Sequence, residues 1–100
     1  MYDTAVIDDP EIDWLRGQID AIDHQILALI QQRMEVVLRV GDKKREKGLA
    51  VYDPTREARL LENLAARAKP PLDMLALQRI FSALVSECRR LENDHVAQHP

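Results

Sequence analysis

The chain has 100 residues, the size of one small domain. Its formal net charge is −3, with 14 basic residues mixed among 17 acidic ones, so it lacks the basic surplus of a nucleic-acid-binding face. Aromatic residues make up 4% of the sequence and there are three glycines, a composition that favours helices over a β-sandwich. We therefore expect an all-α protein that does not bind nucleic acid.

The sequence predicts a cytoplasmic location. A single cysteine, Cys88, cannot form an internal disulfide, which fits a reducing compartment. No apolar run approaches the ~20 residues that span a bilayer. The N-terminal segment MYDTAVIDDPEID is acidic and has no basic region before its short apolar stretch, unlike a signal peptide. We expect no membrane contact.

The acidic residues 1–11 are expected to form a flexible lead-in that is broken by Pro10. A helix is predicted to follow, capped by Asp9 or Asp13. It contains no proline from about Asp13 onward and continues to Lys47. Its apolar residues recur at helical spacing: Leu15, Ile19, Ile22, Ile26, Leu29, Ile30, Met34, Val37 and Val40. The glycine that follows, Gly48, is predicted to end it.

The length of this helix predicts a homodimer. At ~1.5 Å per residue it spans roughly 50 Å. A globule of this chain length has a radius of gyration of only ~13 Å. The remaining residues cannot cover the whole apolar stripe, so a second copy of the chain is the simplest cover.

Three cations lie on or beside that stripe. Arg33 and Lys44 are eleven residues apart, about three turns, and point nearly the same way, while Arg16 lies at the edge of the same stripe. A cation turned inward needs an anion. Asp23, Glu35 or an acid of the second helix could supply that anion through an internal ion pair. Alternatively, the long side chain extends to water and needs no anion. Three cations on one face also predict a site for a small anion.

A second helix is predicted from about Pro54 to Lys69, with Asp53 as its N-cap. Arg56 and Glu57 fall in its first turn, where backbone N–H groups also point outward. Compensation of the helix dipole explains Glu57 equally well.

A third helix is predicted from about Asp73 to Asp94, after Pro70-Pro71, with a flexible tail over residues 95–100. Cys88 and Glu92 are four residues apart and lie on the same side of this helix. Taken alone, a buried cysteine and a solvated terminal glutamate explain both residues.

No metal site is predicted. The three histidines are His24, His95 and His99, and none has a partner at metal-ligand spacing.

Residues 12–94 carry an ordered set of motifs: Leu15-Arg16, Ile19-Asp20-Ala21-Ile22-Asp23, Gln32-Arg33, Val40-Gly41-Asp42-Lys43-Lys44, Val51-Tyr52-Asp53-Pro54-Thr55-Arg56-Glu57 and Ile80-Phe81. Taken together and in this order, these motifs resemble the all-helical chorismate mutases. The resemblance implies three helices per chain and an intertwined homodimer that forms a six-helix bundle. In such a dimer the long first helices pair across the two-fold axis, and both chains contribute to each of two sites.

The resemblance also implies roles for the cations. Arg16 resembles the arginine that is donated to the site of the neighbouring chain. Arg33 resembles the arginine that binds a substrate carboxylate in the chain's own site, a task that suits its forked, permanently charged group. Lys44 resembles the lysine that reaches both a carboxylate and the ether oxygen of the breaking bond.

The remaining implied substrate-binding residues come from the second and third helices. Glu57 resembles the acid that accepts the substrate hydroxyl, with Arg56 as its supporting cation and Asp53 beside them. Cys88 and Glu92 occupy the two positions of the third helix that face the substrate.

The implied reaction is the Claisen rearrangement of chorismate to prephenate, which uses no cofactor, metal or covalent intermediate. It can be accelerated by holding the substrate in a reactive pose and by stabilising negative charge on the ether oxygen. The implied catalytic residues are Lys44 and Glu92, which would donate to that oxygen, and Arg33. The activity belongs to aromatic amino acid biosynthesis.

Two positions depart from the pattern of many relatives. Cys88 stands where many have serine, which weakens a polar contact. Glu92 stands where many bacterial relatives have glutamine. Glutamine donates at any pH, whereas glutamate donates only when protonated.

Two other functions fit the sequence. An isochorismate pyruvate lyase, or an enzyme with both activities, would share the fold and much of the cationic site, but the retained segment from Asp53 to Glu57 favours the mutase. A non-catalytic helical dimerisation or regulatory module would pair Arg33 and Lys44 with its own acids. The sequence is compatible with a free-standing enzyme and with one part of a longer polypeptide.

Overall fold

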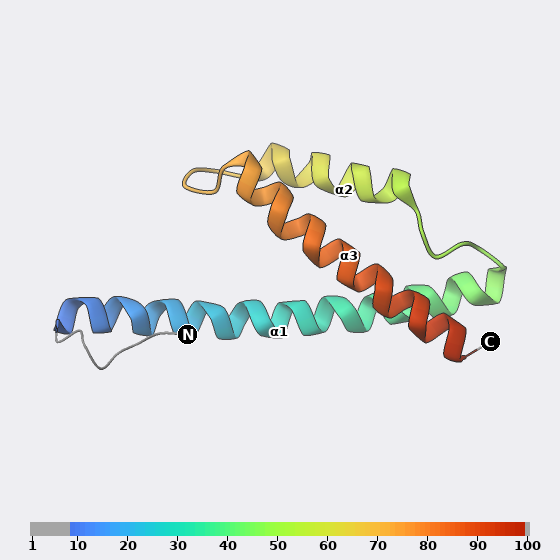
Figure 1. The fold of residues 1–100 in the computed structure, drawn as a ribbon, viewed down its shortest axis with the longest axis horizontal. Helices are drawn as coiled ribbons and strands as arrows, with labels where there is room; N and C mark the ends of the chain where they lie inside the picture. Colours follow the sequence, from blue (N-terminus) through green and yellow to red (C-terminus); the bar gives the residue numbers. More distant parts are fainter. Residues whose placement is uncertain (1–8, 100) are drawn as a thin grey trace. The chain divides into compact units, whose positions relative to one another are not determined.

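The computed structural model describes residues 9–99, and over that range it contains three helices and no strand. They are α1 (Pro10–Lys47), α2 (Pro54–Arg67) and α3 (Met74–Gln98), as Figure 1 shows. The all-α prediction is confirmed. The described chain divides into two compact units, up to Arg33 and from Met34 onward, and each is described by itself.

Helix α1 begins at Pro10, earlier than predicted. The Asp9 carboxylate accepts hydrogen bonds from the backbone N–H groups of Glu11 (2.9 Å) and Ile12 (3.3 Å), which confirms Asp9 as the cap. Pro10 was wrongly predicted to break the chain here. It occupies the first helical position, where its missing N–H has no helical acceptor to lose. Most of the predicted lead-in, residues 1–8, lies outside the described residues.

The C-terminus of α1 is closed by Gly48, as predicted. This glycine has a φ of 68°, a conformation that costs little without a Cβ. The N–H of Gly48 donates to the carbonyl of Arg45 (3.2 Å), and the N–H of Leu49 donates to that of Lys44 (2.8 Å). This pair of bonds is the Schellman arrangement, which satisfies carbonyls left over at a helix end.

Helix α2 follows a short connection, residues 49–53. The Asp53 carboxylate accepts a hydrogen bond from the backbone N–H of Arg56 at 3.0 Å, so the predicted cap is confirmed. The helix ends at Arg67, two residues before the predicted Lys69. Lys69 precedes Pro70, and the residue before a proline is disfavoured in helical conformation.

Helix α3 is capped by Asp73, whose carboxylate accepts from the backbone N–H of Ala76 at 2.8 Å, as predicted. It then continues to Gln98, so the predicted end of the helix at Asp94 was wrong. The extra turn carries His95, which contacts Asp42 of α1 at 2.8 Å. That contact anchors the end of α3.

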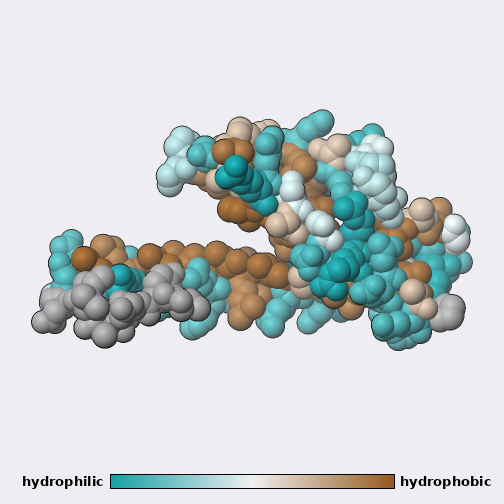
Figure 2. Space-filling model, in the orientation of Figure 1, coloured by the Kyte–Doolittle hydropathy of each residue, from teal (hydrophilic) through white to brown (hydrophobic). Residues whose placement is uncertain are grey.

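The described chain buries few apolar side chains. Helices α2 and α3 pack together, and the buried apolar side chains among residues 9–99 are Leu77, Val85 and Cys88, all on α3. Many large apolar residues of α1 are exposed: Ile12, Trp14, Leu15, Ile19, Ile22, Ile26, Leu27, Leu29, Val36 and Val40. Figure 2 shows hydrophobic atoms gathered along this helix. The long helix therefore presents an apolar face that the described chain leaves open.

Among the described residues, no helix combines the length and the apolar character that crossing a membrane requires.

Candidate functional site

Lys44 and Glu92 form an ion pair between α1 and α3. The Lys44 ammonium lies 3.1 Å from Oε2 of Glu92, and the two side chains are 19% and 9% exposed. The same ammonium donates a hydrogen bond to the backbone carbonyl of Val51 at 2.7 Å. One cation thus joins α1, the connection 49–53 and α3. The sequence left Asp23, Glu35 and an acid of the second helix as possible partners of the inward cations. In the structure, the partner of Lys44 is Glu92 instead.

Gly41 makes room for this pair. It is buried, and a Cβ built on it would lie 3.0 Å from Cγ of Glu92 and 3.2 Å from a methyl group of Val96. Such distances are shorter than ordinary van der Waals contacts, so a larger residue at position 41 would press on Glu92 and Val96 of α3.

The Glu92 carboxyl retains unused hydrogen-bonding capacity. Its Oε2 atom is buried and contacts Lys44 as an ion pair, but no donor among the described residues meets it with hydrogen-bond geometry. A buried polar atom of this kind is normally satisfied by a partner. Here it can accept from, or when protonated donate to, a bound molecule.

Glu57, on the first turn of α2, is held by a residue that the sequence analysis did not select. Nη1 of Arg89 lies 3.5 Å from Oε2 of Glu57. The Arg89 guanidinium also lies over the ring of Tyr52, 4.4 Å from its centroid. The expected supporting cation, Arg56, is exposed, and the cation that contacts Glu57 in the structure is Arg89.

A signal for Arg89 was present in the sequence. It lies four residues after Val85 and three before Glu92, both of which are buried on α3. It is therefore a cation within an apolar helical face, the same pattern that singled out Lys44.

The other candidates of this unit lie on the same elements. Cys88 is buried on α3, one turn before Glu92. Asp53 is exposed, and its carboxylate caps α2. Arg16 and Arg33 lie in the N-terminal unit, on α1, and both are partly buried. The Nη1 atom of Arg16 is buried without a hydrogen-bond partner among residues 9–99.

A second contact fastens α3 to α1 one turn beyond Glu92. Nε2 of His95 lies 2.8 Å from Oδ1 of Asp42, and Nη1 of Arg45 lies 3.3 Å from the same oxygen. The hydrogen bond with His95 is the main cause that lowers the pKa of Asp42 below the usual range of a carboxyl group. The charges of His95, Arg45 and His99 act in the same direction, against the effect of burial.

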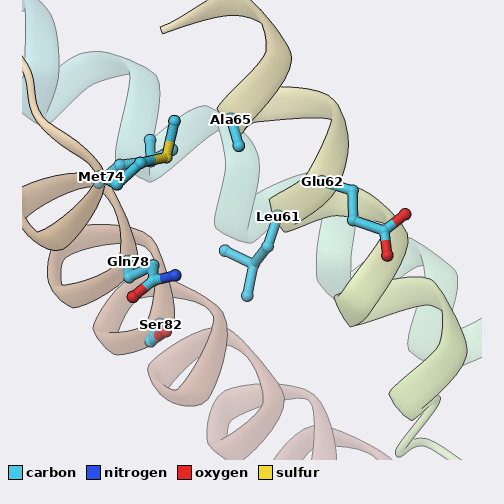
Figure 3. A pocket seen from close by; sticks show the side chains of 7 residues that line it. Leu61, Glu62, Ala65, Met74, Gln78 and Ser82 are labelled. Carbon is cyan, nitrogen blue, oxygen red and sulfur yellow. The ribbon is translucent and has the colours of Figure 1, made fainter.

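A pocket of about 300 Å³ lies between α2 and α3, away from these residues. Figure 3 shows side chains of both helices around it. It is lined by Leu61, Glu62, Ala65, Met74, Leu77, Gln78 and Ser82. None of the candidate residues lines it. No group of three or more His, Cys, Asp or Glu side chains that could hold a metal ion occurs within residues 9–99.

The structure forms two charged pairs from these residues, Lys44 with Glu92 and Glu57 with Arg89. Lys44 can bind a carboxylate or stabilise negative charge that grows on an oxygen. Glu57 can accept a hydrogen bond from a hydroxyl, and Glu92 can donate one when it is protonated. Such a set suits a reaction driven by charge and by the pose of the substrate.

Known proteins share both the sequence and this fold. The family model described as "Chorismate mutase type II" matches residues 15–93. The T-protein of Enterobacter agglomerans is 34% identical over 87 residues, which cover 84% of this chain and 23% of the T-protein. The 4-amino-4-deoxychorismate mutase of Streptomyces pristinaespiralis is 31% identical over 94 residues, covering 93% of this chain and 72% of that protein.

A solved structure of chorismate mutase from Helicobacter pylori, in complex with prephenate, superposes with a TM-score of 0.84. It is 25% identical, and the match covers 92% of this chain and all of that one. The present chain spans about a quarter of the T-protein and about three quarters of the Streptomyces mutase. The matches in sequence and in fold lead to one conclusion: the chain belongs to the chorismate mutase type II family.

Proposed function

We propose that this chain catalyses the rearrangement of chorismate to prephenate. The observation that carries the proposal is the buried Lys44–Glu92 pair, with a separation of 3.1 Å. These are the two residues that would donate to the ether oxygen. They are 48 residues apart in the sequence and come from two different helices, α1 and α3. The Helicobacter pylori relative was solved with prephenate, which supports a substrate of this class.

Lys44 supplies the fixed positive charge of the proposed mechanism. Its bond to the Val51 carbonyl and its contact with Glu92 hold the ammonium in place before a substrate arrives. A cation oriented in advance stabilises the negative charge that grows on the ether oxygen as its bond to carbon breaks, with little reorganisation. Glu92, when protonated, donates a second hydrogen bond to the same oxygen.

The arginines bind the two carboxylates of the substrate. Arg33 binds one in the chain's own site, and Arg16 reaches into the site of a second copy. The apolar face of α1, open in the described chain, supports this homodimer because a second copy would remove it from water. Arg16 and Arg33 are 17 residues apart on one continuous helix, which spaces them about 25 Å along its axis. One helix could therefore serve two sites.

The other residues position the substrate. Glu57 accepts its hydroxyl hydrogen bond, and Asp53 and Arg56 lie in the same segment over the site. Cys88 contacts the substrate without acting as a nucleophile, because a Claisen rearrangement needs none. Holding the flexible enolpyruvyl arm over the ring is the second source of acceleration.

The named activities of the relatives reported above are mutases, which favours rearrangement over the pyruvate elimination of a lyase. The test is loss of chorismate absorbance with identification of the product, repeated with isochorismate. Prephenate from chorismate supports the mutase. Pyruvate from isochorismate alone would point to the lyase, and no turnover together with no thermal shift by chorismate would point to a non-catalytic module.

The shared site is tested with mixed dimers. Arg16→Ala and Arg33→Ala should each be nearly inactive. A heterodimer of the two carries one site with both native arginines, so mixing should restore about half of the activity per heterodimer. Heterodimers that form without regaining activity would show that Arg16 does not act across the interface.

A further inference from the structure

We propose that Arg89 determines which substituent the site accepts at the position that Glu57 contacts: it favours an uncharged hydroxyl over a positively charged amine. This inference rests on the proposed function, because it takes Glu57 as the acceptor of the substrate hydroxyl.

Two contacts fix the Arg89 guanidinium. Nη1 lies 3.5 Å from Oε2 of Glu57, and the group lies over the Tyr52 ring at 4.4 Å from its centroid. The Arg89 and Glu57 side chains are 31% and 27% exposed, so the pair is partly withdrawn from water. A planar guanidinium between a carboxylate and an aromatic face is restricted in position by both.

Arg89 and Lys44 hold the connection 49–53 in the same manner. Lys44 joins the carbonyl of Val51 to Glu92, and Arg89 joins the ring of the next residue, Tyr52, to Glu57. Each cation links the connection to one of the two acids assigned to the substrate. Arg89 is therefore placed to set the position and the charge balance of Glu57.

The charge of Arg89 affects the two substituents differently. A carboxylate that is paired with a guanidinium still has lone pairs to accept a hydroxyl hydrogen bond. A hydroxyl carries no charge and is not repelled by Arg89. An aliphatic amine is protonated at neutral pH, so it would meet the cation of Arg89 beside a carboxylate whose charge is already compensated. The pair thus disfavours the ammonium.

The comparison with an amine is relevant to this fold. The Streptomyces relative, 31% identical, is named for a substrate that carries an amino group in place of the hydroxyl at position 4. Chorismate and 4-amino-4-deoxychorismate therefore form the substrate pair that tests the role of Arg89.

The next residue of α3 provides a matched control. Arg90 carries the same charge, but its side chain is 57% exposed and pairs within its own helix, with Glu87 at 2.8 Å and Asp94 at 3.6 Å. Replacing Arg90 changes the net charge by the same amount and leaves Glu57 and its partner in place.

The experiment measures kcat/KM for both substrates with the wild type, Arg89→Gln and Arg90→Gln. We expect Arg89→Gln to raise the ratio of amino to hydroxyl substrate by roughly fivefold, the effect of a partly exposed ion pair of about 1 kcal/mol. Arg90→Gln should leave the ratio unchanged. The ratio is independent of the fraction of folded enzyme, so a merely structural loss would not move it. Arg89→Met, which keeps an apolar stem against Tyr52, serves as a second neutral variant should the glutamine variant fold poorly.

A double variant identifies the route of the effect. In a Glu57→Gln background, Arg89→Gln should still raise the ratio, because the Arg89 cation repels the ammonium whether or not the carboxylate is present. A ratio that stays constant in Arg89→Gln and Arg89→Met, with an active wild type, overturns this inference and leaves the proposed function intact. A folded wild type that converts neither substrate overturns the proposed function itself.

Discussion

At the scale of single residues, the proposed mechanism makes Glu92 a hydrogen-bond donor to the substrate. Its carboxyl is almost completely buried against Lys44 and has an oxygen without a directed hydrogen bond among the described residues. Its usefulness as a donor depends on a proton. The amide of glutamine has the same shape and donates regardless of pH.

We therefore expect Glu92→Gln to raise kcat several-fold and to make kcat less dependent on pH, because the amide donates a hydrogen bond at every pH. The measurement is kcat and kcat/KM from pH 4.5 to 8.5, with Glu87→Gln, an exposed position of the same helix, as control. A flat wild-type profile with a Gln variant no faster would exclude Glu92 as the donor.

Gly41 offers a second test at this scale. An added methyl group would lie 3.0 Å from Cγ of Glu92. Overpacking of this kind costs about 1–3 kcal/mol, while alanine gains about 1 kcal/mol over glycine within a helix. We expect Gly41→Ala to destabilise the chain by up to about 2 kcal/mol and to lower kcat by at least about tenfold, because Glu92 is displaced.

The control for Gly41→Ala is Gly17→Ala, another position of α1, where an added Cβ meets no atom within 4 Å. This variant should be neutral or more stable by up to about 1 kcal/mol, with unchanged kcat. Urea unfolding and steady-state kinetics measure both effects. Equal kcat values for the two variants would show that the close approach at Gly41 does not position Glu92.

At the scale of elements, the contact between Asp42 and His95 holds the last turn of α3 against α1. The lowered pKa of Asp42 means that the folded chain favours its carboxylate. Its contribution to stability is therefore fully present above the ordinary aspartate range and is lost as pH falls through the lowered folded-state pKa, below about pH 4. His95, Arg45 and His99 are the basic side chains that lower its pKa.

Asp42→Asn should accordingly lower the thermal midpoint by a few degrees at pH 7 and by much less at pH 3. Helicity measured by circular dichroism at both pH values provides the readout. Asp94→Asn, which removes an exposed partner of Arg90, should change neither midpoint appreciably. A difference for Asp42→Asn that is as large at pH 3 as at pH 7 would show that its charge is not the stabilising feature.

The elements also show which features the sequence could predict. The caps at Asp53 and Asp73 and the stop at Gly48 depend on neighbours within five residues, so local patterns sufficed. The last turn of α3 carries His95, which contacts Asp42, 53 residues earlier in the chain. A contact between residues so far apart cannot be predicted from a local sequence pattern.

The candidate site divides in the same way. Inward cations on a helical stripe were visible in the sequence, and Lys44 proved to be one. Its partner Glu92 could be assigned to the site only through the resemblance to a family, because the meeting of α1 and α3 is a tertiary feature. Arg89 carries the same local pattern on α3, four residues after Val85 and three before Glu92, but its pairing with Glu57 of α2 is again a tertiary feature.

At the scale of the whole molecule, the open apolar face of α1 predicts an obligate dimer. Three buried apolar side chains within residues 9–99 make a small core for a chain of this length. We expect sedimentation across a dilution series to show folded dimer giving way to unfolded chain, without a stable folded monomer. A compact, folded monomer at every concentration would contradict the shared site.

Because α1 is one unbroken helix, the sequence separation of two of its residues fixes both their distance along the axis and the angle between them. Each residue advances the helix by about 1.5 Å and turns it by about 100°. One alanine inserted between Ile22 and Asp23 would leave every charge and contact group present, yet would rotate Arg33 by about 100° relative to Arg16. Both sites of the proposed dimer should then fail together. The same insertion in the segment between α2 and α3, residues 68–73, does not rotate one part of a helix relative to another and should be tolerated. We therefore expect activity to be sensitive to a single inserted residue within α1, where the insertion rotates one part of the helix relative to the other. Outside α1, an insertion changes only the length of the chain and should matter less.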